Sequence, residues 1–160
     1  MIISNFFIEL CKRDLPDWPT LIIGLDKGWV TKSEISDYAL KLLSEGQEDT
    51  DISLLAGSES LTDDEVNVLL VTLCKKEGAD IAMKQTDTLE KWRLASLAAL
   101  QHSSLSVQDK LERLQELYAE FGYPNDMASC SIYAQDNIDP LEALQGVVSS
   151  LEQRFAKGSH

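Results

Sequence analysis

The sequence predicts an all-α fold, and three observations lead to this class. Apolar residues recur at helical spacing through most of the chain, capping side chains precede these runs, and isolated glycines follow them. Signals for strands are poor, because no Asn-Gly or Asp-Gly hairpin turn occurs and no long run alternates between apolar and polar residues. We therefore expect a single-domain bundle of about seven helices joined by short loops, with stacked helical hairpins as a variant.

The first half of the chain contains clear signals for helix N-termini. Asp17 is expected to cap a helix that has Pro19 in its first turn, where the missing N–H costs nothing. Thr31 and Thr62 each precede a glutamate by the spacing of a capping box. The helical segments expected here are 3–13, 17–28, 31–46, a short helix at 51–56, and 62–78.

The second half is expected to contain the most buried helix. Asp87 with Glu90 indicates its start, and apolar residues up to Leu100 cover most of its circumference. Residues 79–86 give no clear assignment. Ser106 is expected to cap the helix 106–121, residues 126–133 to form one or two helical turns, and Asp139 to begin the last helix.

Length and composition indicate one soluble domain. The chain has 160 residues, of which 44% are apolar and 26% are charged, as is usual for a globular protein. We expect residues 1–157 to form one helical domain, and residues 158–160 resemble the remnant of an expression tag. Apolar runs stop well short of the roughly 20 residues needed to span a bilayer, and no secretory signal is evident. We expect a cytoplasmic protein without a membrane partner.

Cysteine usage agrees with this location. Cys11, Cys74 and Cys130 are odd in number and widely spaced, which argues against a disulfide framework and against a zinc site. In a reducing cytosol, such thiols behave as small hydrophobic side chains.

The charge distribution indicates the kind of partner. A net charge of -13 makes direct binding to nucleic acid or to an anionic membrane unfavourable. Ten acidic residues and one basic residue, Lys41, lie between Glu34 and Glu65, and five acidic residues but no basic one lie between Phe121 and Gln153. Charge-rich faces are often only solvated, but clustering of this degree also suits a basic protein partner.

The sequence contains no recognisable catalytic or cofactor-binding motif. The one native histidine, His102, has no orienting acid at an evident spacing, and its position suits an interaction with a helix dipole. Glycines are isolated rather than clustered as in a phosphate-binding loop, and no spacing typical of a metal site occurs. We therefore expect no catalytic residues, no cofactor and no metal.

The order of several short motifs resembles a bacterial family of uncharacterised small helical proteins. The resemblance spans roughly residues 18–155, and the segment Ser131 to Gln135 departs from it. The motifs that carry it are Trp18, Gly24-Leu25, Gly28-Trp29 before Thr31, Tyr38-Ala39, Lys91-Trp92, Tyr118-Ala119 with Phe121, Tyr123-Pro124 and Met127.

Several proteins of this family serve as immunity proteins encoded beside polymorphic or contact-dependent toxins. The resemblance thus implies an antitoxin that binds the C-terminal nuclease domain of a cognate toxin, and similar immunity proteins are paired with EndoU-like RNases. The resemblance implies no catalytic residues for this chain. We expect an acidic surface to cover the basic cleft of the nuclease. The expected contact residues are Glu48, Asp49, Asp51, Glu59, Asp63 and Asp64, and then Tyr133, Asp136 and Asp139.

The sequence is also compatible with two other functions. A non-catalytic adaptor would bind a peptide or a partner helix in an apolar groove, with weak dependence on salt. An enzyme would use a carboxylate pair, such as Asp49 with Asp51 or Asp63 with Asp64, although capping and solvation explain these pairs as well. Trp29 and Tyr133 lie outside clean apolar stripes and are candidate interface anchors.

Overall fold

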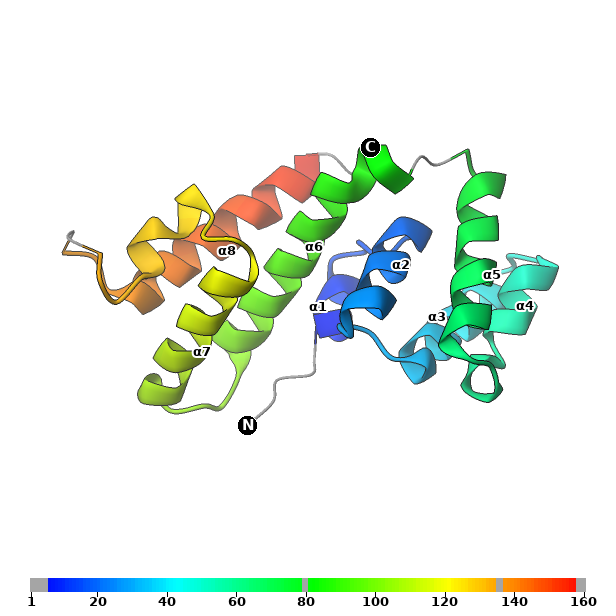
Figure 1. Cartoon of the computed structure of the whole chain (residues 1–160), viewed down its shortest axis with the longest axis horizontal. Coiled ribbons are helices and arrows are strands. Elements are labelled where there is room, and N and C mark those ends of the chain that lie inside the picture. The colour runs from blue at the N-terminus through cyan, green and yellow to red at the C-terminus, as the bar shows by residue number, and fades with distance from the viewer. Residues whose placement is uncertain (1–5, 79–80, 135–136, 158–160) are drawn as a thin grey trace. The chain divides into compact units, whose positions relative to one another are not determined.

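The computed structural model describes residues 6–78, 81–134 and 137–157, and it confirms the all-α class (Figure 1). The described residues form eight α-helices and two 3-10 helices and contain no β-strand. The α-helices are α1 (Phe6–Lys12), α2 (Trp18–Lys27), α3 (Lys32–Ser44), α4 (Thr50–Leu55), α5 (Asp63–Lys76), α6 (Ile81–His102), α7 (Val107–Glu120) and α8 (Pro140–Lys157). The 3-10 helices are η1 (Ser58–Ser60) and η2 (Asn125–Cys130).

The chain divides into two compact units. The central unit consists of Asp14–Trp92, and the terminal unit consists of Met1–Arg13 together with Arg93–His160. The boundary falls between Trp92 and Arg93, inside α6.

The central unit is built around the contact of α2 with α5. α3 packs against α4 and η1, and α4 packs against α5. Trp92 is fully buried, and its Nε1 donates a hydrogen bond to the Thr20 carbonyl oxygen at 2.8 Å. The indole of Trp29 lies against that of Trp92, with ring centroids 5.8 Å apart. Trp29, which the sequence makes a candidate interface anchor, is therefore packed against a residue of its own unit.

In the terminal unit, η2 packs against α7 and α8, which also contact each other. Residues 93–100 of α6 are all buried, which confirms the expected buried helix over this stretch. Arg93 is buried with them, and its two terminal nitrogens donate to the Asp126 carboxylate of η2 at 2.6 and 2.9 Å. This paired geometry links α6 to η2.

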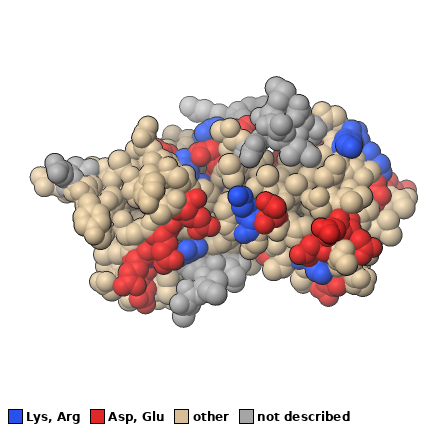
Figure 2. Space-filling model, in the orientation of Figure 1, with Lys and Arg blue, Asp and Glu red and all other residues tan. Residues whose placement is uncertain are grey.

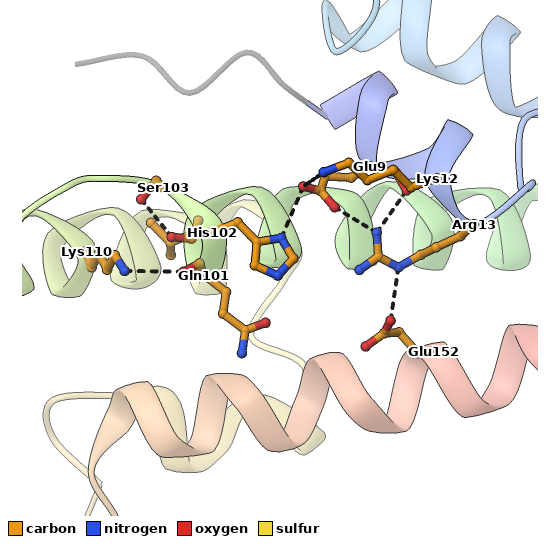
Figure 3. Close-up of polar contacts among 9 residues, drawn as sticks. Glu9, Lys12, Arg13, Gln101, His102, Ser103, Lys110 and Glu152 are labelled. Carbon is orange, nitrogen blue, oxygen red and sulfur yellow. Dashed lines mark hydrogen bonds and ion pairs between the residues drawn. The ribbon is translucent and has the colours of Figure 1, made fainter.

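A second buried charged residue, Glu9, connects α1 to other parts of the terminal unit through ion pairs and hydrogen bonds. Its side chain is only 4% exposed, and its carboxylate receives Arg13 Nη1 at 2.8 Å and Lys12 Nζ at 3.4 Å (Figure 3). His102, the last residue of α6, places Nδ1 3.3 Å from Glu9 Oε1. Arg13 also contacts Glu152 of α8 at 3.3 Å. Burial alone would raise the pKa of Glu9, but its hydrogen bonds with Arg13 and His102 and the positive charges of Lys12 and Arg13 together lower it.

Most predicted helix starts are confirmed by their capping geometry. Thr31 and Thr62 form complete capping boxes, Asp17 accepts a hydrogen bond from the Thr20 N–H, and Ser106 accepts one from the Asp109 N–H. The predicted start at Asp87 is wrong, because α6 already begins at Ile81. No glycine or proline interrupts residues 81–87, so the helix continues through the Asp87 signal. Residues 79 and 80, also left unassigned by the sequence, lie outside the described residues.

Within the ranges that the structure describes, no helix has the length and apolar character required to cross a membrane.

Candidate partner-binding surface

The predicted acidic tract is divided between the two ends of α5 in the central unit. α5 has 14 residues, so its ends lie about 20 Å apart at the usual helical rise. We call Glu59, Asp63 and Asp64, near the start of α5, the N-end group. We call Glu48, Asp49 and Asp51, near its last turn, the C-end group. The tract is thus continuous in sequence but forms two separate clusters in the fold.

Two carboxylates of the C-end group, those of Asp49 and Asp51, already have partners within the chain. Asp49 caps α4 and accepts hydrogen bonds from the N–H groups of Asp51 and Ile52. Lys76 Nζ lies 3.1 Å from Asp49 Oδ2 and 2.6 Å from Asp51 Oδ2. Its hydrogen bond lowers the pKa of Asp49, and the hydrogen bonds to Asp51 and Asp49 raise the pKa of Lys76. Lys76 therefore offsets part of the negative charge that the sequence places here.

The N-end group is more available to a partner. Glu59, Asp63 and Asp64 are all exposed, and the Asp63 side chain retains 73% of its accessible surface. Lys32 Nζ lies 3.8 Å from Asp63 Oδ1, and it donates its hydrogen bond of 2.8 Å to the Leu61 carbonyl oxygen instead. Figure 2 shows acidic side chains gathered over this part of α5. The first turn of α5 also suits carboxylates because they complement the positive end of the helix dipole.

The C-end group borders a pocket that sequence reasoning did not find. The pocket has a volume of about 290 Å³ and is lined by Trp18, Gln47, Glu48, Asp49, Ile52, Leu73, Lys76 and Glu77. Trp18 Nε1 donates a hydrogen bond to Glu77 Oε1 at 3.0 Å. No local pattern in the sequence indicates that α2, α4 and α5 meet around Trp18 and Lys76.

The remaining predicted contact residues belong to the terminal unit. Tyr133 is 85% exposed, in agreement with a role in binding. Asp139 accepts a hydrogen bond from the Leu141 N–H at the start of α8, so it has a structural role as well as an exposed position. Asp136 lies outside the described residues.

A further acidic surface follows one face of α7 in the terminal unit. Its exposed members recur every three or four residues and form the stripe of acidic surface along α7 in Figure 2. Arg113 lies 3.4 Å from Glu116 and 3.9 Å from Glu120. We call this surface the α7 stripe; it consists of Asp109, Glu112, Glu116 and Glu120. The contact residues predicted from the sequence do not include this surface.

The polar clusters show no arrangement typical of metal binding. In the described part of the chain, no three His, Cys, Asp or Glu side chains converge as metal ligands would. The pairs Asp49 with Asp51 and Asp63 with Asp64 occur at helix starts, where carboxylates satisfy backbone N–H groups or the helix dipole.

A comparison with known protein families matches residues 8–157, a range that includes residues of both units. The matching family is described as "Uncharacterized protein conserved in bacteria (DUF2247)". The chain belongs to this family. No curated protein and no solved structure matches it significantly. Membership in DUF2247 confirms the predicted resemblance to an uncharacterised bacterial family.

Proposed function

We propose that this protein is a cytoplasmic immunity protein that binds the nuclease domain of a cognate toxin and blocks its basic cleft. The observation that carries the proposal is the N-end group, which presents three exposed carboxylates at one end of α5. A nuclease holds phosphates with cationic side chains, and an acidic surface of similar charge density competes for the same groups. The proposal includes no catalytic step by this chain.

The strongly acidic composition supports the same function through association kinetics. Opposite charges steer two proteins together, which raises association rates by roughly 10 to 10³-fold at low salt. A cell that receives a nuclease benefits from fast capture before its RNA is cut. Within this class we propose an EndoU-like RNase as the toxin, because similar immunity proteins are paired with such RNases.

Growth of cells tests the proposal. The C-terminal segment of the open reading frame immediately upstream of this gene is expressed with and without this protein. We expect growth to stop when the segment is expressed alone and to recover when this protein is present. Degraded RNA in the arrested cells would identify the blocked activity. If the segment is harmless, or if growth does not recover, the proposal is wrong.

Charge reversal locates the interface. Asp63→Lys combined with Asp64→Lys should slow association with the toxin domain about tenfold or more at low salt. Asp109→Lys with Glu112→Lys is a matched control, because it reverses two charges near the start of α7. If only the control pair slows association, the interface lies on the α7 stripe and not on the N-end group.

One observation favours a second function, that of an adaptor. Ile132, Tyr133 and Ile138 are large side chains that remain 54%, 85% and 48% exposed. Such side chains suit contact with an apolar peptide or helix. Partner binding that changes little between low and high salt would favour this adaptor function.

A further inference from the structure

We propose that the pocket between α2, α4 and α5 receives one arginine side chain from the basic partner and anchors the complex there. This inference rests on the proposed function, since it names the partner group that the acidic surface would bind. The pocket is defined by Trp18, Glu48, Asp49, Ile52, Lys76 and Glu77, together with Gln47 and Leu73.

The size of the pocket suits one side chain. At about 290 Å³ it lies at the lower limit of cavities that hold small molecules or cofactors. Binding energy in protein interfaces concentrates where a single large side chain, often arginine, tryptophan or tyrosine, fills a pocket of the partner. A pocket of this volume at an acidic surface therefore suits an anchor residue.

The lining combines an apolar wall with carboxylates. Trp18, Ile52 and Leu73 are buried, with exposures of 4%, 3% and 3%. Glu48 and Glu77, which also line the pocket, are exposed. A long cationic side chain matches this arrangement, because its methylene groups contact apolar surface while its charged end reaches carboxylates.

Two features of the pocket favour a cation in particular. Leu73, Lys76 and Glu77 belong to the C-terminal end of α5, where the helix dipole attracts positive charge. The Glu77 carboxylate is oriented by the hydrogen bond from Trp18 Nε1, and the pocket also contains the Asp49 carboxylate. Arginine is favoured over lysine, because its planar guanidinium can donate to several carboxylate oxygens at once.

Lys76 shows that Asp49, one of the carboxylates of the pocket, holds a cation. Its ammonium lies within 3.1 Å of Asp49 and 2.6 Å of Asp51, although 47% of its side chain remains exposed. An incoming guanidinium would compete with Lys76 for Asp49. The arginine of the partner then displaces Lys76 from Asp49. Its removal should strengthen partner binding rather than weaken it.

A small probe tests the pocket without the toxin. N-acetyl-arginine methylamide is titrated into the full chain, and the indole N–H resonance of Trp18 is followed by NMR, because Glu77 is its acceptor. The citrulline analogue, which has nearly the same shape but no charge, is the control. We expect a saturable shift with arginine and none with citrulline. Equal shifts, or no shift with arginine, would overturn the proposal.

Affinity for the toxin domain tests the same pocket in the complex. Glu48→Gln with Glu77→Gln should weaken binding roughly tenfold or more, and the amide introduced at position 77 keeps an oxygen that can accept from Trp18. Glu112→Gln with Glu116→Gln on α7 removes the same charge and should change affinity less than about threefold. Lys76→Met should tighten binding severalfold. If wild type binds but the two double variants behave alike, the pocket proposal fails while the immunity function stands; if wild type does not bind, the immunity function fails.

Discussion

Gly24 and Trp92 lie so close together that no side chain fits between them. A Cβ atom on Gly24 would lie 2.2 Å from Cζ2 and 2.8 Å from Cε2 of the Trp92 indole. Both residues belong to motifs on which the family resemblance rests, and the structure gives a physical reason for the pair. The close approach of α2 to the indole lets Trp92 Nε1 reach the Thr20 carbonyl oxygen.

Gly24→Ala should therefore destabilise the central unit. The added methyl group must displace a fully buried indole, and overpacking of this kind costs about 1–3 kcal/mol. Gly146→Ala in α8 is the matched control, because a Cβ there meets nothing within 4 Å. Alanine at that position should stabilise the helix by about 0.5–1 kcal/mol. Urea unfolding of both variants measures the difference, and equal stabilities would contradict the packing described here.

The buried carboxylate of Glu9 predicts a loss of stability in acid. Its pKa in the folded protein is below the ordinary value of 4.5, so the unfolded chain binds protons more readily. The stabilisation is complete well above pH 4.5 and is lost as the pH falls through the lowered pKa. Glu9→Gln should cost about 1–3 kcal/mol near neutral pH and much less at about pH 3. Urea unfolding at both pH values measures the change.

Glu152→Gln provides the comparison for Glu9. Glu152 contacts the same Arg13, but its side chain is 45% exposed, so its replacement should change stability by less than about 0.5 kcal/mol. A stability difference between Glu9→Gln and wild type that did not change with pH would show that Glu9 acts only through packing.

The pair formed by Arg93 and Asp126 should contribute more than a surface ion pair. The Arg93 side chain is 4% exposed, so Asp126→Ala would leave a buried guanidinium without its carboxylate. We expect a loss of about 2–3 kcal/mol. Glu116→Ala interrupts the more exposed pair with Arg113 and should cost less than about 0.5 kcal/mol. Similar losses in thermal unfolding would contradict the distinction between the two pairs.

The cysteines should differ in reactivity. Burial, followed by the charge of Asp126, raises the pKa of Cys130 to about 11. At about pH 8 only roughly one Cys130 thiol in a thousand is the reactive thiolate. Cys74 is also buried, whereas Cys11 is partly exposed. We expect Cys11 to react quickly with a disulfide reagent, and Cys74 and Cys130 to react slowly until urea unfolds the protein. Three equal reaction rates in the folded protein would contradict this prediction.

Local signals in the sequence predicted the helices well, because capping and periodicity depend on neighbouring residues. Thr31, Thr62 and Ser106 begin helices where expected. The start of α6 was missed, because Asp87 resembles a cap although the chain before it is already helical. A capping residue is informative only where the preceding segment is not itself a helix.

The candidate surface was harder to predict, because it depends on contacts between distant segments. Lys76 reaches Asp49 and Asp51 across α4 and α5, which offsets charges that the sequence counts as free. Trp29, a candidate interface anchor because it lies outside the apolar stripes, also packs on Trp92, which no local pattern in the sequence indicates. The N-end group remained exposed as expected, because Glu59, Asp63 and Asp64 surround a helix start.

Inhibition of the toxin domain in solution tests the central claim most directly. The purified C-terminal domain of the upstream protein is incubated with RNA at low salt, and this protein is added in increasing amounts. We predict that cleavage falls linearly and stops at about one equivalent, and that Asp63→Lys with Asp64→Lys requires a large excess. Cleavage that continues at saturating amounts of this protein would contradict the account.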